Sequence, residues 1–285
     1  MLTPEQITFY HQQGYLAVDD VLSDAEVTAL WRVTDEFVEK SRQVSEHDDV
    51  FDLEPGHSPE VPRLRRLKNP VRQHPVYEGI LRHERILDIV AQLVGADIRY
   101  NGDKLNMKSA AFGSPVEWHQ DWAFYPHTND DLLAVGVAID DMTTENGCLL
   151  VIPESHKGKI YIHHQDGYFV GAVTEADFDE SAAVPVEVKA GGISIHHVRT
   201  LHGSLPNTSS QTRRLLLLQY CAADAWPLLD FADWDEFNKL LLRGEPTWEP
   251  RSKAVPVRIP RPYAERGGSI YEVQSLLERS TLKHA

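Results

Sequence analysis

Cysteine is scarce in this chain, which has only Cys148 and Cys221. Both lie inside apolar runs that are typical of strands, so we predict two reduced core thiols and no disulfide bond. Long apolar stretches are also missing, because no segment approaches the roughly 20 consecutive apolar residues that a membrane span needs. The polar N-terminus reads as a helix and not as a secretory signal. These features together predict a cytoplasmic protein.

Positive charge is in short supply: 28 Lys and Arg stand against 43 Asp and Glu, for a formal net charge of −15. This balance argues against nucleic-acid binding, whose affinity comes largely from neutralising phosphates. One basic segment, Arg63 to Lys68 followed by Arg72, interrupts the acidic chain. It would suit an anionic substrate or cosubstrate, or it is a solvated surface stripe, and the sequence does not choose between these.

Helical signals dominate the first third of the chain. Thr3 and Ser23 each begin a capping box, which predicts helices that end at Gly14 and at about Ser41. The residues between them, 15–18, read as a short strand. The polar segment 45–62 is predicted to be a mobile loop, and apolar periodicity predicts a third helix over about 76–94.

Short strand-like segments follow, separated by turns rich in Gly, Pro and Asn. Many short strands at this spacing favour a barrel or sandwich over alternating strands and helices. We therefore expect one domain over 1–285, with a helical N-terminal part (1–95), a β core (about 96–224) and a covering C-terminal extension (225–285). A late helix is predicted over about 270–278. The predicted strands cover residues 98–101, 104–109, 116–119, 132–139, 148–152, 184–188, 193–197 and 214–221.

His119 and Asp121 form a candidate pair of metal ligands. On a strand, residues two apart point to the same face, so both side chains can reach one metal inside a barrel. Two His and one carboxylate occupy one face of an octahedron and leave open positions, which suits iron(II). The chain has three His-x-Asp triplets. His47 lies in the polar loop and His164 in an apparent insertion, whereas His119 follows an apolar strand, and we therefore favour His119.

His202 is the third candidate ligand, with His196 and His197 as rivals on the preceding strand. Arg213 lies eleven residues after His202, at the start of an apolar strand. An arginine fork binds a carboxylate through two hydrogen bonds and stays charged when buried. Arg213 would therefore suit a dicarboxylate cosubstrate, and Arg214 is the alternative because neighbouring strand residues face opposite ways.

Four segments in this order resemble the phytanoyl-CoA dioxygenase family. They are LTPEQITFYHQQGYLAV, WHQD, ENGCLLVIPESHKG and HHVRTLHGSLPNTS with Arg213. The resemblance implies a double-stranded β-helix of the jelly-roll, cupin-like type with flanking helices. It also implies Fe(II) held by His119, Asp121 and His202, with 2-oxoglutarate as cosubstrate and O2 as oxidant.

By position, the resemblance assigns 2-oxoglutarate contacts to Gln120, Ser204 and Arg213, and less directly to Lys68 in the basic segment. Relatives in this family often have Trp where this chain has Gly136, so we expect a roomier pocket. A carboxylate at Asp121 implies hydroxylation, because related halogenases need a small residue there.

Aromatic residues next to the ligands are candidates for the substrate pocket, namely Trp118, Trp122, Tyr125 and His127. The expected reaction is hydroxylation of an unactivated C–H bond in a small organic substrate, with an anionic group one option. The alternatives are a zinc hydrolase, which the same ligand set could serve, and a non-catalytic barrel protein. Neither the substrate nor the oligomeric state follows from the sequence.

Overall fold

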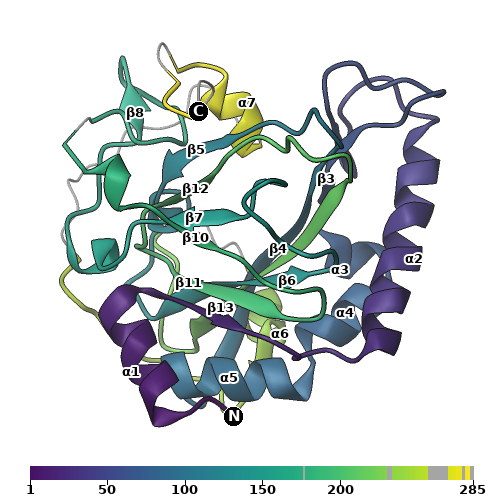
Figure 1. Cartoon of the computed structure of the whole chain (residues 1–285). Coiled ribbons are helices and arrows are strands. Elements are labelled where there is room, and N and C mark those ends of the chain that lie inside the picture. The colour runs from purple at the N-terminus through teal and green to yellow at the C-terminus, as the bar shows by residue number, and fades with distance from the viewer. Residues whose placement is uncertain (176, 230–232, 256–268, 278–279, 283–285) are drawn as a thin grey trace.

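The computed structural model describes residues 1–175, 177–229, 233–255, 269–277 and 280–282. The described chain is mainly β, with two antiparallel sheets that face each other and helices around them (Figure 1). This confirms the predicted mainly β class with flanking helices. Among the described residues, no helix is both long and apolar enough to cross a membrane.

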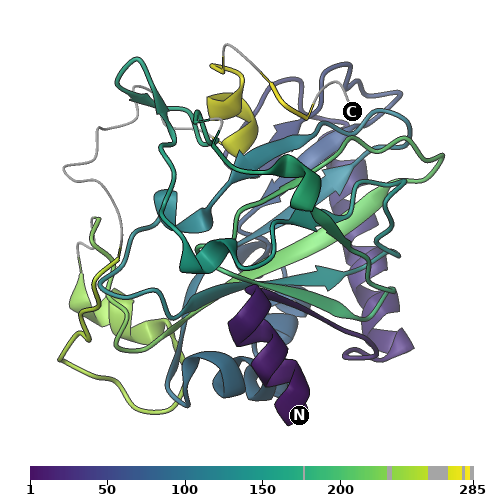
Figure 2. The same ribbon diagram turned by 60° about the vertical axis from the view of Figure 1, so that its left-hand side comes forward.

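The large sheet has the strand order β1-β11-β6-β13-β4-β3-β2, and β14 pairs with β4 beside this path. Its central strands, β13 and β4, are also its longest (Figure 2). Every pair within it is antiparallel. The strands are β1 (Tyr15–Val18), β2 (Phe51–Leu53), β3 (Leu64–Lys68), β4 (Ile98–Lys108), β6 (Leu132–Ala138), β11 (Ile193–His197), β13 (Arg213–Ala222) and β14 (Leu241–Arg243).

The small sheet has the order β10-β7-β12-β5, and a separate hairpin pairs β8 with β9. Strand β5 at its edge and strand β12 beside it carry two of the predicted metal ligands. The strands are β5 (Val116–His119), β7 (Leu149–Val151), β8 (His164–Gln165), β9 (Tyr168–Phe169), β10 (Val184–Val186) and β12 (His202–Ser204).

Five helices precede the first long strand and gather on the outer side of the large sheet (Figure 1). Both predicted capping boxes are confirmed at Thr3 and Ser23, and Gly14 ends the first helix with φ of 82°. The helices are α1 (Pro4–Gln13), α2 (Asp24–Ser41), α3 (Pro70–Gln73), α4 (Pro75–Leu81) and α5 (Glu84–Val94).

The main core lies between these helices and the outer face of the large sheet. On β4, Leu105 and Met107 join this core, whereas Lys104, Asn106 and Lys108 alternate with them and point to the opposite face. The large sheet therefore buries an apolar face against the helices and presents a partly polar face to the small sheet.

The predicted single helix over 76–94 is wrong: the structure has α4 and α5 with a break at Arg82 and His83. Helical periodicity from Tyr77 and Leu81 would bring Glu84 and Asp88 to the buried face. Both residues are charged, and neither is buried. The apolar pattern begins again at Ile86, two residues after Glu84. The break lets each segment bury its own apolar side.

The predicted mobile loop over 45–62 contains a buried strand, β2, paired with β3. Asp52 and Glu54 are almost fully buried there, at 1% and 2% exposure. Lys68 Nζ lies 2.8 Å from Asp52, and Arg65 lies 2.8 Å from Glu54. Carboxylates of a neighbouring strand thus neutralise much of the basic segment, a pairing that composition alone did not reveal.

The C-terminal part adds α6 (Trp234–Lys239), β14 and α7 (Ile270–Gln274), of which only the last was predicted. Helix α7 lies over β5 at the opposite end of the molecule from α5 (Figure 1). The amide of Gln274 bonds to Glu117 of β5, and the Glu117 carboxylate accepts hydrogen bonds from Thr281 and Leu282. Part of the predicted helix over 270–278 falls outside the described residues.

Candidate active site

His119, Asp121 and His202 converge in a buried cluster. His119 ends β5 and lies directly opposite His202 on β12, while Asp121 begins the short 3-10 turn after β5. Asp121 Oδ1 lies 3.8 Å from His119 Nε2 and 3.9 Å from His202 Nε2. Within the described residues, this is the one group of three such side chains close enough to hold a metal ion.

Both histidines are oriented by backbone carbonyls. His119 Nδ1 lies 2.8 Å from the carbonyl oxygen of Glu117, and His202 Nδ1 lies 2.8 Å from that of Thr200. Each Nδ1–H therefore donates to a carbonyl, and each Nε2 lone pair is directed toward the cluster. Burial lowers the pKa of His119 to about 4 and that of His202 well below its usual range, so both rings are neutral at pH 7. Neutral, oriented imidazoles beside a carboxylate fit a divalent metal such as iron(II).

A hydrogen-bonded network holds the Asp121 carboxylate. His196 Nε2 lies 3.2 Å from Asp121 Oδ2, and the Tyr125 hydroxyl also bonds to this carboxylate. Gln219 Nε2 in turn donates to the Tyr125 hydroxyl at 2.8 Å. Burial alone would raise the pKa of Asp121, but His196, His202 and Lys104 hold it well below its usual range. His196, a rival ligand in the sequence, thus supports Asp121 and leaves the metal position to His202.

A cavity of about 60 Å³ adjoins the triad and lies between the two sheets. Its charged lining residues, among those described, are Asp121, Lys104 and Arg213. Ser204 also lines it, as the family resemblance implied, and so do Asn106 and Gln219 of the large sheet.

Arg213 is buried at 3% exposure and faces this cavity. Its Nη2 donates to the Gly147 carbonyl at 3.1 Å, whereas Nε and Nη1 have no partner among the described residues. Unpaired buried guanidinium nitrogens are costly, and a carboxylate in the cavity would give one of these two nitrogens a partner. This fits the distal carboxylate of 2-oxoglutarate.

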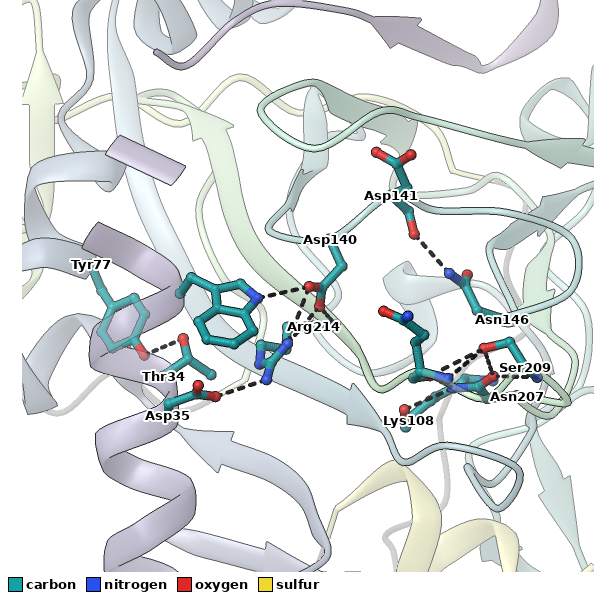
Figure 3. A network of polar contacts seen from close by, with 12 residues as sticks. Thr34, Asp35, Tyr77, Lys108, Asp140, Asp141, Asn146, Asn207, Ser209 and Arg214 are labelled. Carbon is teal, nitrogen blue, oxygen red and sulfur yellow. Dashed lines mark hydrogen bonds and ion pairs between the residues drawn. The ribbon is translucent and has the colours of Figure 1, made fainter. Parts of the chain in front are cut away.

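Arg214 faces the other way, toward Asp35 of α2 (Figure 3), and does not line the cavity. It forms ion pairs with Asp35 at 2.8 Å and with Asp140 at 3.1 Å, and its guanidinium stacks on the Trp31 ring. The alternation of β13 therefore gives the two neighbouring arginines separate roles, Arg213 at the cavity and Arg214 at the helix.

Lys104 lies on β4 and lines the cavity near Asp121. Its ammonium makes no hydrogen bond or ion pair with the part of the chain that the structure describes. Burial lowers the pKa of Lys104, and the nearby Asp121 opposes that shift. Lys104 was not among the predicted site residues, although polar residues at the alternate positions 104, 106 and 108 indicate an inward polar face.

Two of the predicted cosubstrate contacts are not supported by the geometry. The Gln120 amide donates to the carbonyls of Lys159 and Arg199 and accepts from the Tyr161 N–H, so it braces loops outside the cavity. Lys68 is paired with Asp52 and donates to the Asp48 carbonyl. Neither residue lines the cavity.

Three of the four predicted substrate residues also lie outside the cavity lining. Trp118 packs in a cluster with Ile152 and Leu201, and Trp122 packs against Leu132 and Val198. His127 is buried, with its Nδ1 2.9 Å from the Tyr125 carbonyl. These aromatic side chains therefore serve packing. Tyr125 alone reaches the site, through the Asp121 carboxylate.

The predicted roomier pocket at Gly136 is likewise not supported. A Cβ atom added at Gly136 would lie 2.6 Å from Ser194 Oγ and 3.2 Å from Leu215. Neighbouring side chains thus occupy the space that a larger residue would need.

Tyr271 of α7 is a further residue that the sequence analysis missed. It lines the cavity, and its ring lies 4.6 Å from the Arg65 guanidinium and 5.4 Å from that of Arg66. The C-terminal part of the chain thus closes the Arg213 end of the cavity, a contact between residues too far apart in sequence for any local pattern to indicate.

Comparison with known proteins shows the family of this chain. The family model described as phytanoyl-CoA dioxygenase (PhyH) matches residues 10–215. A probable alpha-ketoglutarate-dependent hypophosphite dioxygenase from Stutzerimonas stutzeri is 36% identical over 280 residues, which cover 96% of this chain and 97% of that protein. The L-proline trans-4-hydroxylase of Streptomyces griseoviridis is 28% identical over 236 residues, covering 74% of this chain and 83% of the hydroxylase.

Solved structures share the fold at lower identity. EctD from S. alaskensis with bound Fe superposes with a TM-score of 0.66 at 22% identity, covering 90% of this chain and 89% of that one. EvdO2 from Micromonospora carbonacea var. aurantiaca complexed with 2-oxoglutarate has a TM-score of 0.61 at 22% identity, covering 83% of this chain and 97% of that one.

These findings confirm three predictions: the family, the 2-oxoglutarate-dependent dioxygenase class, and the use of iron and 2-oxoglutarate. The chain belongs to the phytanoyl-CoA dioxygenase family.

Proposed function

We propose that His119, Asp121 and His202 hold iron(II) and that Arg213 binds the distal carboxylate of 2-oxoglutarate. The observation that carries this assignment is the pair of unpartnered, buried Arg213 nitrogens in the same cavity as the triad. Bound iron would supply oxygen activation, coupled to decarboxylation of 2-oxoglutarate to succinate and CO2. A zinc hydrolase has no use for such a clamp, which favours the oxygenase over that alternative.

The proposed scaffold is a single domain over 1–285 built on a double-stranded β-helix. Two facing antiparallel sheets with His119 and His202 on adjacent strands support this assignment. The helical part (1–95) supports the large sheet from outside, and the described residues of α7 and 280–282 in the C-terminal extension (225–285) lie over β5. Two unpaired buried cysteines support a cytoplasmic location.

The protein residues divide the work of the reaction. His196 and Tyr125 hold Asp121 in place, while Arg213 and Ser204 orient the cosubstrate. The cavity lies between the two sheets, which limits the access of water. The expected reaction is hydroxylation of an unactivated C–H bond, with one oxygen atom of O2 entering the substrate and the other entering succinate. The carboxylate at Asp121 supports hydroxylation over halogenation.

The second candidate reaction is oxidation of a P–H bond. It is favoured by the similarity to the probable hypophosphite dioxygenase of Stutzerimonas stutzeri, which extends over nearly the full length of both proteins. In that reaction hypophosphite would gain one oxygen atom at phosphorus and become phosphite. Together, hypophosphite and 2-oxoglutarate supply the four electrons that reduce O2. The substrate partner is in either case a small molecule.

The test is succinate formation from 2-oxoglutarate by purified protein with Fe(II), ascorbate and O2. The substrate panel would contain hypophosphite, methylphosphonate, L-proline and ectoine. We expect substrate-dependent succinate formation and a visible charge-transfer absorption when Fe(II) and 2-oxoglutarate bind without O2. Absence of both signals across the panel, with no bound iron, would refute the proposed function.

A further inference from the structure

The cavity has cationic groups at two separate places. Arg213 is opposite Lys108 in the pairing of β13 with β4, and Lys104 lies four residues further along β4. At the rise of an extended strand these positions are roughly 13 Å apart. Asp121 lies at the Lys104 end, because His196, whose Nε2 is 3.2 Å from Asp121, is in the row of paired strand residues that continues through Ala134 and Gln219 to Gly102, two residues from Lys104. If Arg213 binds 2-oxoglutarate, Lys104 remains for another molecule.

Lys104 is fixed by the pairing of its strand on both sides, but its ammonium forms no ion pair with the described residues. It lies in the centre of the large sheet, with Leu217 of β13 on one side and Lys68 of β3 on the other. Lys68 has Asp52 as its partner, but Lys104 has none among the described residues. Lys104 is half-buried, and a partly desolvated ammonium without an ion-pair partner is stabilised when an anion binds beside it.

The charge balance of the cavity specifies the charge of that anion. The charged groups lining the described cavity are Lys104, Arg213 and Asp121, and a histidine that ligates a metal does so in its neutral form. Iron(II) and the 2-oxoglutarate dianion cancel each other. One positive charge then remains, and a substrate with one negative charge neutralises it.

Size and charge also exclude other substrate classes. The described cavity of about 60 Å³ must hold both 2-oxoglutarate and substrate, so it favours a small substrate; pockets for drug-sized ligands have about 300–1,000 Å³. A zwitterion would need a carboxylate for its ammonium group, but the only carboxylate lining the described cavity is Asp121, which the metal and His196 occupy.

We propose that Lys104 is the substrate-recognition group and that the substrate is a small monoanion bound at the Asp121 end of the cavity. This inference rests on the proposed function, because it assigns 2-oxoglutarate to Arg213. It deepens that function by naming the substrate class and one specificity-determining residue. Hypophosphite satisfies the size and charge requirements, and its oxidation to phosphite is balanced by 2-oxoglutarate and O2 as described above.

The test compares Lys104→Met with wild type and with Lys157→Met, which removes a surface lysine whose side chain is 48% exposed. Lys104→Met keeps the length of the side chain and removes its charge. We expect the KM for hypophosphite to rise about 10- to 100-fold, the range for loss of a charge-assisted hydrogen bond. The KM for 2-oxoglutarate should change less than about threefold, and Lys157→Met should match wild type.

A binding measurement separates this inference from the proposed function. Hypophosphite should perturb the visible absorption of the anaerobic Fe(II)–2-oxoglutarate complex in wild type and in Lys104→Arg, but not in Lys104→Met or Lys104→Gln. The inference fails if no monoanion perturbs the wild-type complex, if zwitterions are oxidised in preference to monoanions, or if the 2-oxoglutarate KM rises more than the anion KM. If the wild-type protein binds neither iron nor 2-oxoglutarate, the proposed function and this inference are refuted together.

Discussion

The two sheets of this protein contribute different parts of the site. The small sheet supplies His119 and His202, and its outer side is covered by loops and by the C-terminal segment around Leu282. The large sheet supplies Lys104, Arg213 and Gln219 to the cavity, and its outer face is packed against helices. The two histidine ligands thus come from one sheet and the cationic groups of the cavity from the other.

This division teaches that ligand binding and metal binding can be perturbed separately. The inward groups of the large sheet alternate with core residues, so replacing them leaves the apolar packing against the helices in place. The triad depends on hydrogen bonds from loops and neighbouring strands, such as those of Thr200 and His196.

The largest expected effect comes from the metal ligands of the small sheet. His119→Ala should lose bound iron and lower succinate formation by more than about 100-fold, because removal of even outer partners of a metal ligand costs about 10- to 100-fold. His164→Ala is the matched control, since it removes the other His-Gln-Asp histidine and should keep iron. The measurement is iron content after reconstitution. A wild-type iron content in His119→Ala would show that His119 is not a metal ligand.

The adjacent pair Arg213 and Arg214 tests the two faces of the large sheet. Arg213→Met should raise the KM for 2-oxoglutarate about 10- to 100-fold, because charge-assisted bonds to the carboxylate are lost. Arg214→Met should leave that KM unchanged and lower the free energy of unfolding by about 1–3 kcal/mol, through loss of the contacts with Asp35 and Asp140. Steady-state kinetics and denaturant unfolding check both variants. The reverse pattern would contradict the assignment of faces.

Tyr125→Phe tests the connection between the two sheets, because Tyr125 joins Gln219 of the large sheet to Asp121. The variant removes a single hydroxyl, so we expect iron affinity to fall about tenfold, as for other partners of metal ligands. Iron titration measures this effect, and Trp122→Phe serves as an aromatic control outside the cavity. Equal iron affinities in wild type and Tyr125→Phe would show that the Tyr125 hydroxyl does not contribute to metal binding.

The last prediction concerns the stability of the fold and not ligand or metal binding. Burial opposes ionisation of Asp130, but Lys253 and Arg199, each 2.7 Å away, hold its pKa down to about 2. A depressed carboxyl pKa stabilises the fold above the ordinary value near 3.8, and this contribution is lost as pH falls through about 2.

Asp130→Asn should therefore lower the free energy of unfolding by about 2 kcal/mol at pH 7. The difference from wild type should shrink between pH 4 and pH 2, as measured by denaturant unfolding at each pH. A difference that does not depend on pH would show that the ion pairs contribute nothing to stability.

Local patterns predicted the elements whose signals lie within a few residues. The capping boxes at Thr3 and Ser23 and the strand ends at His119 and His197 agree with the structure. The predicted loop over 45–62 failed, because Asp52 and Glu54 are buried only through pairing with residues of β3. Such pairing depends on tertiary contacts, and composition alone does not indicate it.

The sequence by itself determined the family and the residue types of the site, because the His-x-Asp pair, the later His202 and Arg213 follow each other in a characteristic order. Only the tertiary structure decided which nearby polar residues belong to the cavity. Gln120 and Lys68 do not line the cavity, because their polar groups have partners elsewhere. Lys104 lines the cavity, although it was not predicted. The physical reason is that a side chain's role depends on which partners reach it, and those partners come from strands distant in sequence.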